Sequence, residues 1–305
     1  YIAVAGNSKF AWVTLQENNA IARVNIDRAE VQQIFGLGFK NHGEFGAGFD
    51  ASDRDDQIRI RRWPVFGMYQ PDAIGFFVTR GRAYLITANE GDARDYAGFS
   101  EEARVGELTL DGNAFENAQR LQRDAALGRL TVTTTLGDDG NDGDYEALYA
   151  FGARSVSIWS ASGRFRQIAD TQDQIESLIA SIYPDQFNSD NDANDSFDSR
   201  SDAKGPEPEG LAIFKRGGQV FAFVGLERIG GVMIVDVTSP SQPRFVDYVN
   251  LRDFNGDPML DTAGDLGPEG LLVIEAADSP TGTPLLVVCN EISGSTTIYR
   301  IVSGQ

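Results

Sequence analysis

The sequence predicts an all-β protein of the β-propeller class, folded as a single domain over residues 1–305. Two observations lead to this prediction. A unit of two apolar strands joined by a short turn recurs four times, and acidic residues mark the ends of the recurring units. Repeated units of this kind cannot bury their apolar faces alone, so they stack side by side as the blades of a propeller do.

Each of the four repeats ends on a glutamate that follows its second strand. The repeats are Tyr1–Glu17, Asp72–Glu90, Glu209–Glu227 and Glu269–Glu291. A proline and an acid open three of them, as Pro71-Asp72, Pro208-Glu209 and Pro268-Glu269. Fixed ends around turns of variable length are typical of a repeated structural unit. The alternative is a β-sandwich whose hairpins resemble one another by coincidence.

We expect each repeat to continue into a blade of four antiparallel strands. The later strands are predicted at 21–27 and 32–38 in the first repeat, and at 232–238 and 244–250 in the third. In the second repeat they are predicted at 146–153, 155–160 and 165–170, after a long insertion. The fourth repeat stops after a third strand at 296–302.

Two insertions, 91–127 and 171–207, are expected to interrupt the blades, with helical spacing at 115–127 and 172–183. The chain thus carries about four blades, and the first repeat lacks its opening Pro-acid pair. We therefore expect an N-terminal portion with further blades, in the same precursor or on a separate chain, to complete a propeller of seven blades.

Charge narrows the classes of partner. The chain has 45 acidic and 26 basic residues and a formal net charge of −19. Such a field repels nucleic-acid phosphates and attracts cations, so a nucleic-acid partner is not expected. The alternative interpretation is that the acidity serves only solubility in salty or extracellular surroundings. With no run of 18 apolar residues, no membrane span is expected either.

His42 is the only histidine and Cys289 the only cysteine. Zinc and copper sites need several imidazoles or thiolates, so we expect neither zinc nor an organic cofactor. His42 is interpreted as an ordinary surface-loop residue and Cys289 as a core thiol. A bound metal should therefore be a hard cation that prefers oxygen ligands.

The acids at the ends of the repeats are candidate ligands for such a cation. The first strand of a blade lies nearest the propeller axis, so the acids that open this strand converge at one end of the channel. Calcium accepts six to eight oxygen ligands with loose geometry and suits such a ring. The alternative is that these acids accept backbone hydrogen bonds and hold the blades together. The candidates are Asp72, Glu90, Glu207, Glu209, Glu227, Glu269 and Glu291.

Three loops that alternate Asp, Asn and Gly suggest further calcium ligands, although none matches a full EF-hand. A solvated flexible loop is the competing interpretation for each. The candidates are Asp138, Asp142 and Asp144 in the first loop, Asp190, Asp192, Asp195 and Asp198 in the second, and Asp253 and Asp257 in the third. Together with the ring, these loops predict more than one Ca²⁺.

Several unusual blocks also resemble a known family, the choice-of-anchor I family. They include VTLQENNAIA at 13–22, WPVFGMYQPDAI at 63–74, YLITANEGDARDY at 84–96, KGPEPEGL at 204–211 and LERIGGVMIVDVT at 226–238. The family contains bacterial extracellular proteins, often labelled alkaline phosphatase, and mesenchyme-specific cell-surface glycoproteins linked to biomineralisation. The resemblance implies a propeller and export to a secreted, cell-surface or periplasmic location.

Two functions follow from these observations. The first is a secreted, acidic, calcium-binding propeller that acts as an extracellular-matrix, surface or mineral-associated interaction module. The second is a calcium-dependent phosphoesterase, resembling alkaline phosphatase or phytase, with its site at the channel mouth. In that case Ca²⁺ would bind the phosphoryl oxygens of a phosphate-ester ligand, and Arg94 or Arg228 would add a bidentate contact. Whether the chain is an enzyme depends on whether positive charge at the ring is open to solvent.

Overall fold

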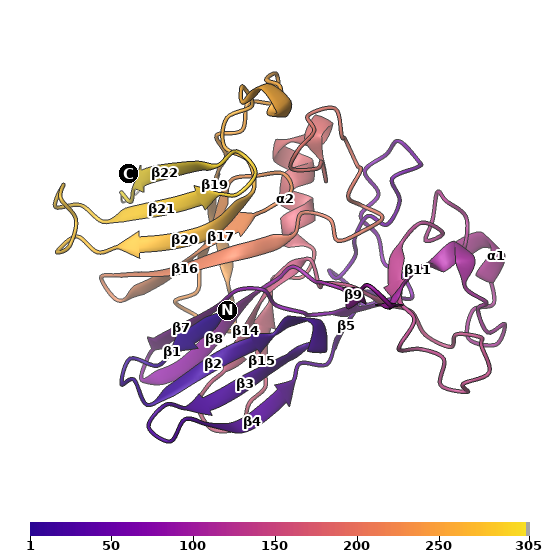
Figure 1. Cartoon of the computed structure of the whole chain (residues 1–305), viewed down its shortest axis with the longest axis horizontal. Helices are drawn as coiled ribbons and strands as arrows, with labels where there is room; N and C mark the ends of the chain where they lie inside the picture. Colours follow the sequence, from indigo (N-terminus) through magenta and orange to yellow (C-terminus); the bar gives the residue numbers. More distant parts are fainter. Residues whose placement is uncertain (303–305) are drawn as a thin grey trace.

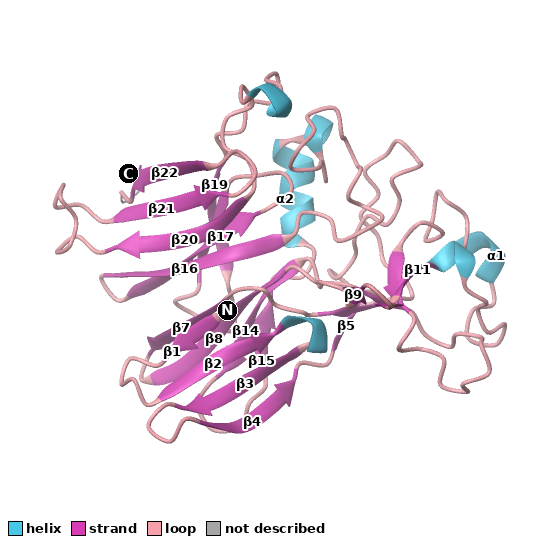
Figure 2. Cartoon of the chain, in the orientation of Figure 1, coloured by secondary structure: helices cyan, strands magenta, loops and turns pink. Residues whose placement is uncertain are grey.

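The computed structural model describes residues 1–302 and confirms an all-β protein of the propeller type (Figures 1 and 2). Four antiparallel sheets correspond to the four repeats, and their first strands lie side by side: β1 against β7, β7 against β16, and β16 against β20. The first two blades contain β1 (Ile2–Val4), β2 (Phe10–Leu15), β3 (Ala20–Asn25), β4 (Glu30–Gly36), β7 (Ile74–Thr79), β8 (Arg82–Asn89), β14 (Ser155–Ser160) and β15 (Gln167–Asp170). The last two contain β16 (Pro208–Arg216), β17 (Gln219–Leu226), β18 (Val232–Asp236), β19 (Arg244–Val249), β20 (Pro268–Ile274), β21 (Leu285–Asn290) and β22 (Ser295–Arg300).

Tight turns set the register of the two central hairpins. Arg80 and Gly81 join β7 to β8 with φ angles of 49° and 73°. Positive φ at both central residues is the geometry of the turn that best matches the twist of paired strands. Gly217 and Gly218 join β16 to β17 in the same way, with φ angles of 57° and 85°. The strands of each hairpin therefore pair in a fixed register, which places the acids at their ends.

The hydrophobic core lies between neighbouring blades. Trp12, Leu85 and Trp159 are buried between the first and second blades. Phe77 and Val224 belong to the cluster between the second and third blades. A further cluster, which includes Phe214 and Leu286, joins the third blade to the fourth. Burial of apolar side chains from facing sheets is what holds propeller blades together.

The second blade is interrupted between β8 and β14, and the inserted chain helps to form a separate five-stranded sheet. This sheet contains β5 (Phe39–Asn41), β6 (Phe66–Met68), β11 (Glu102–Arg104), β12 (Thr131–Thr133) and β13 (Tyr149–Ala150), beside a small hairpin of β9 (Asp95–Tyr96) and β10 (Phe99–Ser100). The prediction that 146–153 is a strand of the second blade was therefore wrong. Its only strand, β13, pairs with β12 and β6, because Leu148 and Ala150 pack into the inserted core.

Helices are few and short. Across the chain, 3₁₀ turns lie at Gln16–Asn18, Val105–Glu107, Pro184–Gln186 and Pro258–Leu260. In the first insertion α1 covers only Ala118–Leu121 of the predicted 115–127. In the second, α2 (Gln174–Ile182) confirms the helical spacing and packs Ile175 and Ile179 into the core between the second and third blades. Within residues 1–302, no helix has the length and apolar character needed to cross a membrane.

Gln70 holds both ends of the chain inserted between β8 and β14, which extends beyond the predicted 91–127 to residue 154. Its carbonyl accepts a hydrogen bond from the N–H of Gly91 at 3.1 Å, and its side-chain oxygen accepts one from the N–H of Gly152 at 3.2 Å. Its amide nitrogen donates to the Asp92 carbonyl at 2.6 Å. The insertion thus leaves and re-enters the blade at one point, and β8 pairs directly with β14 from Asn89↔Ser155 onward.

Candidate functional site

Five predicted acids gather where the inner hairpins of the second and third blades begin and end. Asp72 precedes β7 and Glu90 follows β8, while Glu207 and Glu209 open β16 and Glu227 follows β17. Oxygens of Asp72, Glu90 and Glu209 all lie within 4.8 Å of one another, as do oxygens of Glu90, Glu207 and Glu227. We call these five residues the acid cluster. Glu90 belongs to both groups and joins them.

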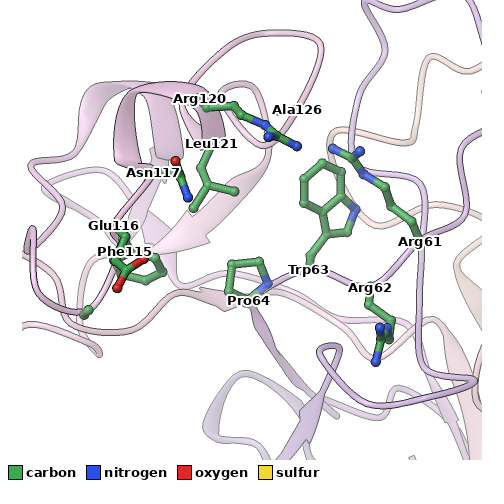
Figure 3. Close-up of a pocket in the computed structure, with 11 residues that line it drawn as sticks. Arg61, Arg62, Trp63, Pro64, Phe115, Glu116, Asn117, Arg120, Leu121 and Ala126 are labelled. Atoms are coloured by element: carbon green, nitrogen blue, oxygen red, sulfur yellow. The ribbon is translucent and has the colours of Figure 1, made fainter.

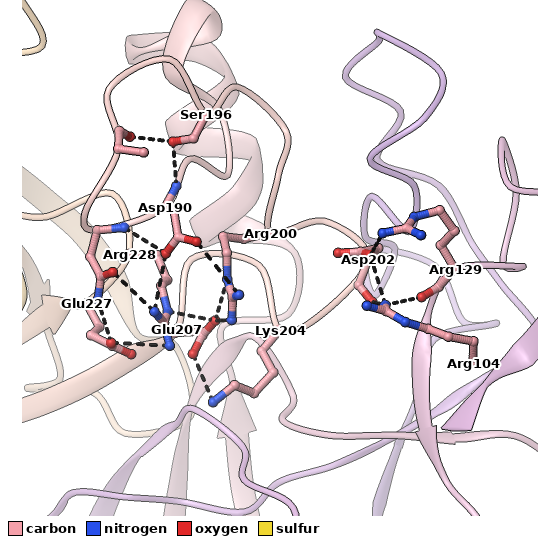
Figure 4. A network of polar contacts seen from close by, with 12 residues as sticks. Arg104, Arg129, Asp190, Ser196, Arg200, Asp202, Lys204, Glu207, Glu227 and Arg228 are labelled. Atoms are coloured by element: carbon pink, nitrogen blue, oxygen red, sulfur yellow. Dashed lines mark hydrogen bonds and ion pairs between the residues drawn. The ribbon is translucent and has the colours of Figure 1, made fainter. Parts of the chain in front are cut away.

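Glu207 is the most enclosed member of the acid cluster, with a fully buried side chain. Figure 4 shows three cations around it. Its Oε1 lies 2.6 Å from Arg200 Nη2 and 3.0 Å from Arg228 Nε, and its Oε2 lies 2.8 Å from Lys204 Nζ. Burial opposes ionisation of this carboxyl, but the three cations together hold its pKa at about 2. Glu207 is therefore an ionised structural centre.

The backbone of Glu207 has a φ of 49°, in the left-handed region. Glu207 precedes Pro208, and the proline ring disfavours this conformation in the residue before it. Such a conformation costs on the order of 1–3 kcal/mol and persists where the surroundings hold it firmly. Here the N–H of Glu227 donates to the Glu207 carbonyl at 3.0 Å, and the three ion pairs hold the side chain.

The other end of the acid cluster lacks such compensation. Neither Asp72 nor Glu209 forms an ion pair within residues 1–302, and Asp72 Oδ2 and Glu209 Oε2 are buried without a hydrogen-bond partner there. Burial and the nearby Glu90 raise the pKa of Asp72 to about 6. Burial and the charge of Glu227 raise the pKa of Glu209 to about 9. Buried carboxylate oxygens without a donor are destabilising unless they are protonated or bind a cation.

Glu90 and Glu227 occupy the middle of the acid cluster. Glu90 accepts from Gln16 Nε2 at 2.9 Å and pairs with Lys204 Nζ at 2.7 Å. Its pKa is nevertheless raised, because burial outweighs the attraction of Lys204. Glu227 lies 3.3 Å from Arg228 Nη2, and burial together with Glu207 raises its pKa to about 8. Carboxyl groups therefore outnumber paired cations toward Asp72 and Glu209.

The spacing of Asp72, Glu90 and Glu209 fits a calcium ion. Ligand oxygens lie about 2.3–2.6 Å from Ca²⁺, so two oxygens on one ion are separated by at most about 5 Å. The 4.8 Å limit among these three residues satisfies that requirement. The two buried oxygens that accept no hydrogen bond, Asp72 Oδ2 and Glu209 Oε2, are available as ligands for such an ion.

The close approach of β16 to β20 depends on Gly210. A methyl group at this position would collide with the Glu269 carbonyl and would lie 2.7 Å from Leu271 Cδ1. Glu269 is accordingly near enough to raise the pKa of both Asp72 and Glu209 through its charge. Of the three opening acids, Asp72 and Glu209 therefore share a carboxylate group, and Glu269 lies near it without belonging to it. Glu291 is exposed and also lies outside both carboxylate groups.

The three acidic loops do not form equivalent sites. In the first, Asp138 accepts hydrogen bonds from the backbone of its own loop, while Asp142, which is exposed, comes together with Asp144 and Glu146, which are half-buried. The predicted loop residues otherwise do not meet in any group of three carboxylates within residues 1–302. Asp253 and Asp257 cap local turns, accepting from Asn255 N and Met259 N.

In the loop at 188–202 the acids separate. Asp190 pairs with Arg228 at 3.3 Å, and Asp192 and Asp195 are exposed. Asp198 is buried, accepts a hydrogen bond from Ser201 at 2.5 Å, and has its pKa raised to about 8 mainly by burial. Asp198 faces the protein interior, so the loop does not gather its carboxylates around one point.

The two arginines predicted to bind phosphate are engaged with acids. Arg228 contacts Glu207, Glu227 and Asp190, as described above. Arg94 forms a two-pronged pair with Glu101, at 3.1 Å from Nε and 2.7 Å from Nη2. Neither guanidinium is free to meet a substrate at the acid cluster.

Two single-residue interpretations were wrong. His42 is buried, not on the surface: its Nδ1 lies 2.6 Å from the Ala47 carbonyl, and burial lowers its pKa well below the usual value. Cys289 is exposed rather than in the core, because it points away from the buried face of β21. An apolar strand with one solvent face gives no sign of which face a small residue occupies.

Sequence reasoning missed Lys204 and Arg200, which neutralise much of the acid cluster. Lys204 is held almost entirely within it and also donates to the Gly91 carbonyl at 2.6 Å. A signal was present: Lys204 stands three residues before Glu207 in the Lys-Gly-Pro-Glu block. Arg200 lies in the acidic loop, where the surrounding aspartates obscured its role.

Comparison with known proteins places the chain in a family. A family model described as the choice-of-anchor I domain matches residues 1–240. Gigasin-3a of Magallana gigas is 34% identical over 195 residues, covering 59% of this chain and 66% of that protein. The mesenchyme-specific cell surface glycoprotein of Strongylocentrotus purpuratus is 27% identical over 236 residues, covering 67% of this chain and 30% of that protein.

The chain therefore spans just under two thirds of the first relative and less than a third of the second. Among solved structures, the periplasmic gluconolactonase PpgL of Pseudomonas aeruginosa is 14% identical with a TM-score of 0.35, over 98% of this chain and 65% of that one. This structural likeness is too weak to support any inference about function. Since the family model matches far more than half of its length, the chain belongs to the choice-of-anchor I domain family.

Proposed function

We propose that this protein is a surface or extracellular β-propeller module that binds Ca²⁺ at the acid cluster, with Asp72, Glu90 and Glu209 as ligands. One observation carries the proposal: oxygens of these three residues lie within 4.8 Å of one another, and two of the carboxylates have a buried oxygen without a donor. The name of the sea-urchin relative, a cell surface glycoprotein, supports the surface or extracellular location.

A cation bound here would act mainly on the junction between the second and third blades. Asp72 and Glu90 belong to the hairpin of β7 and β8, whereas Glu209 belongs to β16. A bound Ca²⁺ would replace repulsion between these carboxylates with shared coordination and so stabilise the junction. The proposed role is that of a cation-dependent interaction module whose blade geometry is fixed by calcium.

The same geometry gives less support to a phosphoesterase. A site that binds a phosphate ester must offset the substrate's negative charge with cations that are free to contact it. Arg228, Arg200 and Lys204 are already paired with Glu207, and Arg94 is paired with Glu101. Removing Arg228 from Glu207 would leave a buried carboxylate without part of its compensation.

The test is titration of chelator-treated protein with CaCl2 by isothermal titration calorimetry, beside elemental analysis of the purified protein. We expect saturable binding that Asp72→Asn and Glu209→Gln each weaken at least about tenfold, equivalent to ~1.4 kcal/mol. Glu291→Gln is the matched control, because it removes an exposed acid that closes another repeat and lies outside both carboxylate groups. Equal affinity in all four proteins would refute the assignment of this site.

A parallel assay of phosphatase activity on p-nitrophenyl phosphate, with and without Ca²⁺, separates the two functions. Binding without turnover is the expected result. Calcium-dependent turnover that Asp72→Asn abolishes would instead establish the phosphoesterase.

A further inference from the structure

A second candidate site shares no residue with the acid cluster and lies where the chain between β5 and β6 meets the chain inserted between β8 and β14. Figure 3 shows a pocket of about 510 Å³ between the segment that precedes β6 and the start of α1. Arg61, Trp63 and Pro64 line one side, and Phe115, Arg120 and Leu121 line the other. This volume is in the range of pockets that hold small organic molecules.

The pocket is basic, although the protein as a whole is strongly acidic. Arg61, Arg62 and Arg120 line it, and none of the three forms an ion pair anywhere in residues 1–302. Glu116 is the only acid among the lining residues of this pocket, and within residues 1–302 it forms no ion pair. Uncompensated arginines are unexpected where acids outnumber bases 45 to 26.

Two of the guanidinium groups converge. In Figure 3 those of Arg61 and Arg120 turn toward each other beside the Trp63 ring, while Arg62 points away. Burial lowers the pKa of Arg61, and the charges of Arg59 and Arg120 lower it further. Two like charges held close together are repulsive unless an anion lies between them.

The aromatic residues keep Arg61 in place. Its guanidinium carbon lies 3.8 Å from the centroid of the Trp63 ring, a close cation–π contact. Trp63 is itself fixed, since it is buried and its Nε1 donates to the Phe49 carbonyl at 3.0 Å. Arg62 makes a separate cation–π contact, with its guanidinium carbon 4.6 Å from the centroid of the Phe45 ring. Arg61 thus presents a pre-oriented donor edge to the pocket, which lowers the entropic cost of binding an anion.

We propose that this pocket binds a small organic anion, with one carboxylate, sulfate or phosphate group held between Arg61 and Arg120. Planar guanidinium groups bind such oxyanions through paired hydrogen bonds. Pro64, Phe115 and Leu121 would contact the uncharged body of the ligand. The net charge of −19 repels extended polyanions, so a ligand with a single anionic group fits better.

The experiment compares matched probes by isothermal titration calorimetry on the full chain. The probes are glucuronate, N-acetylglucosamine 6-sulfate and glucose 6-phosphate, with glucose and N-acetylglucosamine as their uncharged counterparts. We expect at least one anionic probe to bind saturably and its neutral counterpart to bind at least tenfold more weakly. The anion that binds best identifies which of the three chemical groups the site prefers. No saturable binding of any anionic probe, or equal binding of the neutral sugars, would overturn the proposal.

Amino-acid substitutions test which residues bind the anion. Arg61→Gln and Arg120→Gln should each weaken the best anionic probe at least tenfold, whereas Arg123→Gln, an exposed neighbour outside the pocket, should not. Arg120 is exposed, so its replacement is not expected to disturb folding. Asp72→Asn should leave anion binding unchanged, which separates this site from the calcium site. Undiminished binding in both arginine variants would place the anion elsewhere and refute the assignment.

Discussion

The ammonium group of Lys204 lies 2.8 Å from a carboxylate oxygen of Glu207, three residues further along the chain and fully buried. The same nitrogen lies 2.7 Å from Glu90 in the neighbouring blade. One lysine thus connects the acids of two blades.

Replacing Glu207 should destabilise the protein strongly. In Glu207→Gln, three buried or half-buried cations lose their shared carboxylate, and removing one partner of a buried ion pair costs about 3–5 kcal/mol. Urea unfolding followed by circular dichroism measures the loss. Glu30→Gln, which breaks the exposed pair with Arg28, is the control and should change the unfolding free energy by less than about 1 kcal/mol. Similar effects of the two changes would contradict the structural role of Glu207.

The calcium-free protein should lose stability as the pH rises from about 5 to about 9. The pKa of Glu209 is raised to about 9 in the folded state, so the folded protein holds a proton that the unfolded chain has released. Its contribution is complete below the unfolded pKa and disappears as the pH passes the folded one. Urea unfolding of chelator-treated protein at several pH values tests this. Glu209→Gln should flatten the dependence and Glu291→Gln should not.

Calcium should remove most of this loss. The ion competes with protons for Asp72 and Glu209, so its stabilising effect is expected to be larger at pH 8.5 than at pH 5.5. Thermal unfolding with and without 1 mM CaCl2, roughly the range of weak extracellular calcium modules, gives the comparison. A calcium-induced shift of the same size at both pH values would argue against binding at these carboxylates.

Substituting Gly210 tests the packing that brings the opening acids together. In Gly210→Ala the added methyl group meets the Glu269 carbonyl, a backbone atom that cannot move aside cheaply. Overpacking of this kind typically costs about 1–3 kcal/mol. The matched control is Gly218→Ala in the turn that ends the same strand, where the cost comes from its positive φ rather than from a neighbour. We expect only Gly210→Ala to alter calcium affinity as well as stability.

Cys289 should react in the native state. Its exposed position on β21 predicts stoichiometric labelling by a maleimide without denaturant, and Cys289→Ser should abolish it. Labelling that begins only in urea would mean that the thiol is covered.

The blades were predictable because their signals are local. Alternating apolar residues, a turn such as Arg80-Gly81, and the proline–acid pairs at 71–72, 208–209 and 268–269 each act over a few residues. The strand at 149–150 was misassigned because it pairs with β12 in the inserted chain and with β6, which comes from a distant part of the chain. The period of a strand shows that it pairs, but not with which partner.

The candidate site was predictable in its acids but not in its cations. Asp72, Glu209 and Glu269 follow from the repeat, because equivalent positions in neighbouring blades must approach the same axis. Lys204 and Arg200 belong to no repeat, and their positions depend on how residues 188–207 fold back over the blades. The pocket at Arg61 and Arg120 joins the chain between β5 and β6 to the chain inserted between β8 and β14, so no local sequence pattern predicts it.

The hydrogen bonds from Gln70 to both ends of the inserted chain have a consequence for how such proteins diversify. Because both ends of the first insertion are fixed at one residue and β8 pairs directly with β14, the inserted chain is in effect a long appendage on an intact blade. Its length and contents can change without altering the axis on which the acids converge. Relatives could therefore keep the acid cluster while changing the inserted chain.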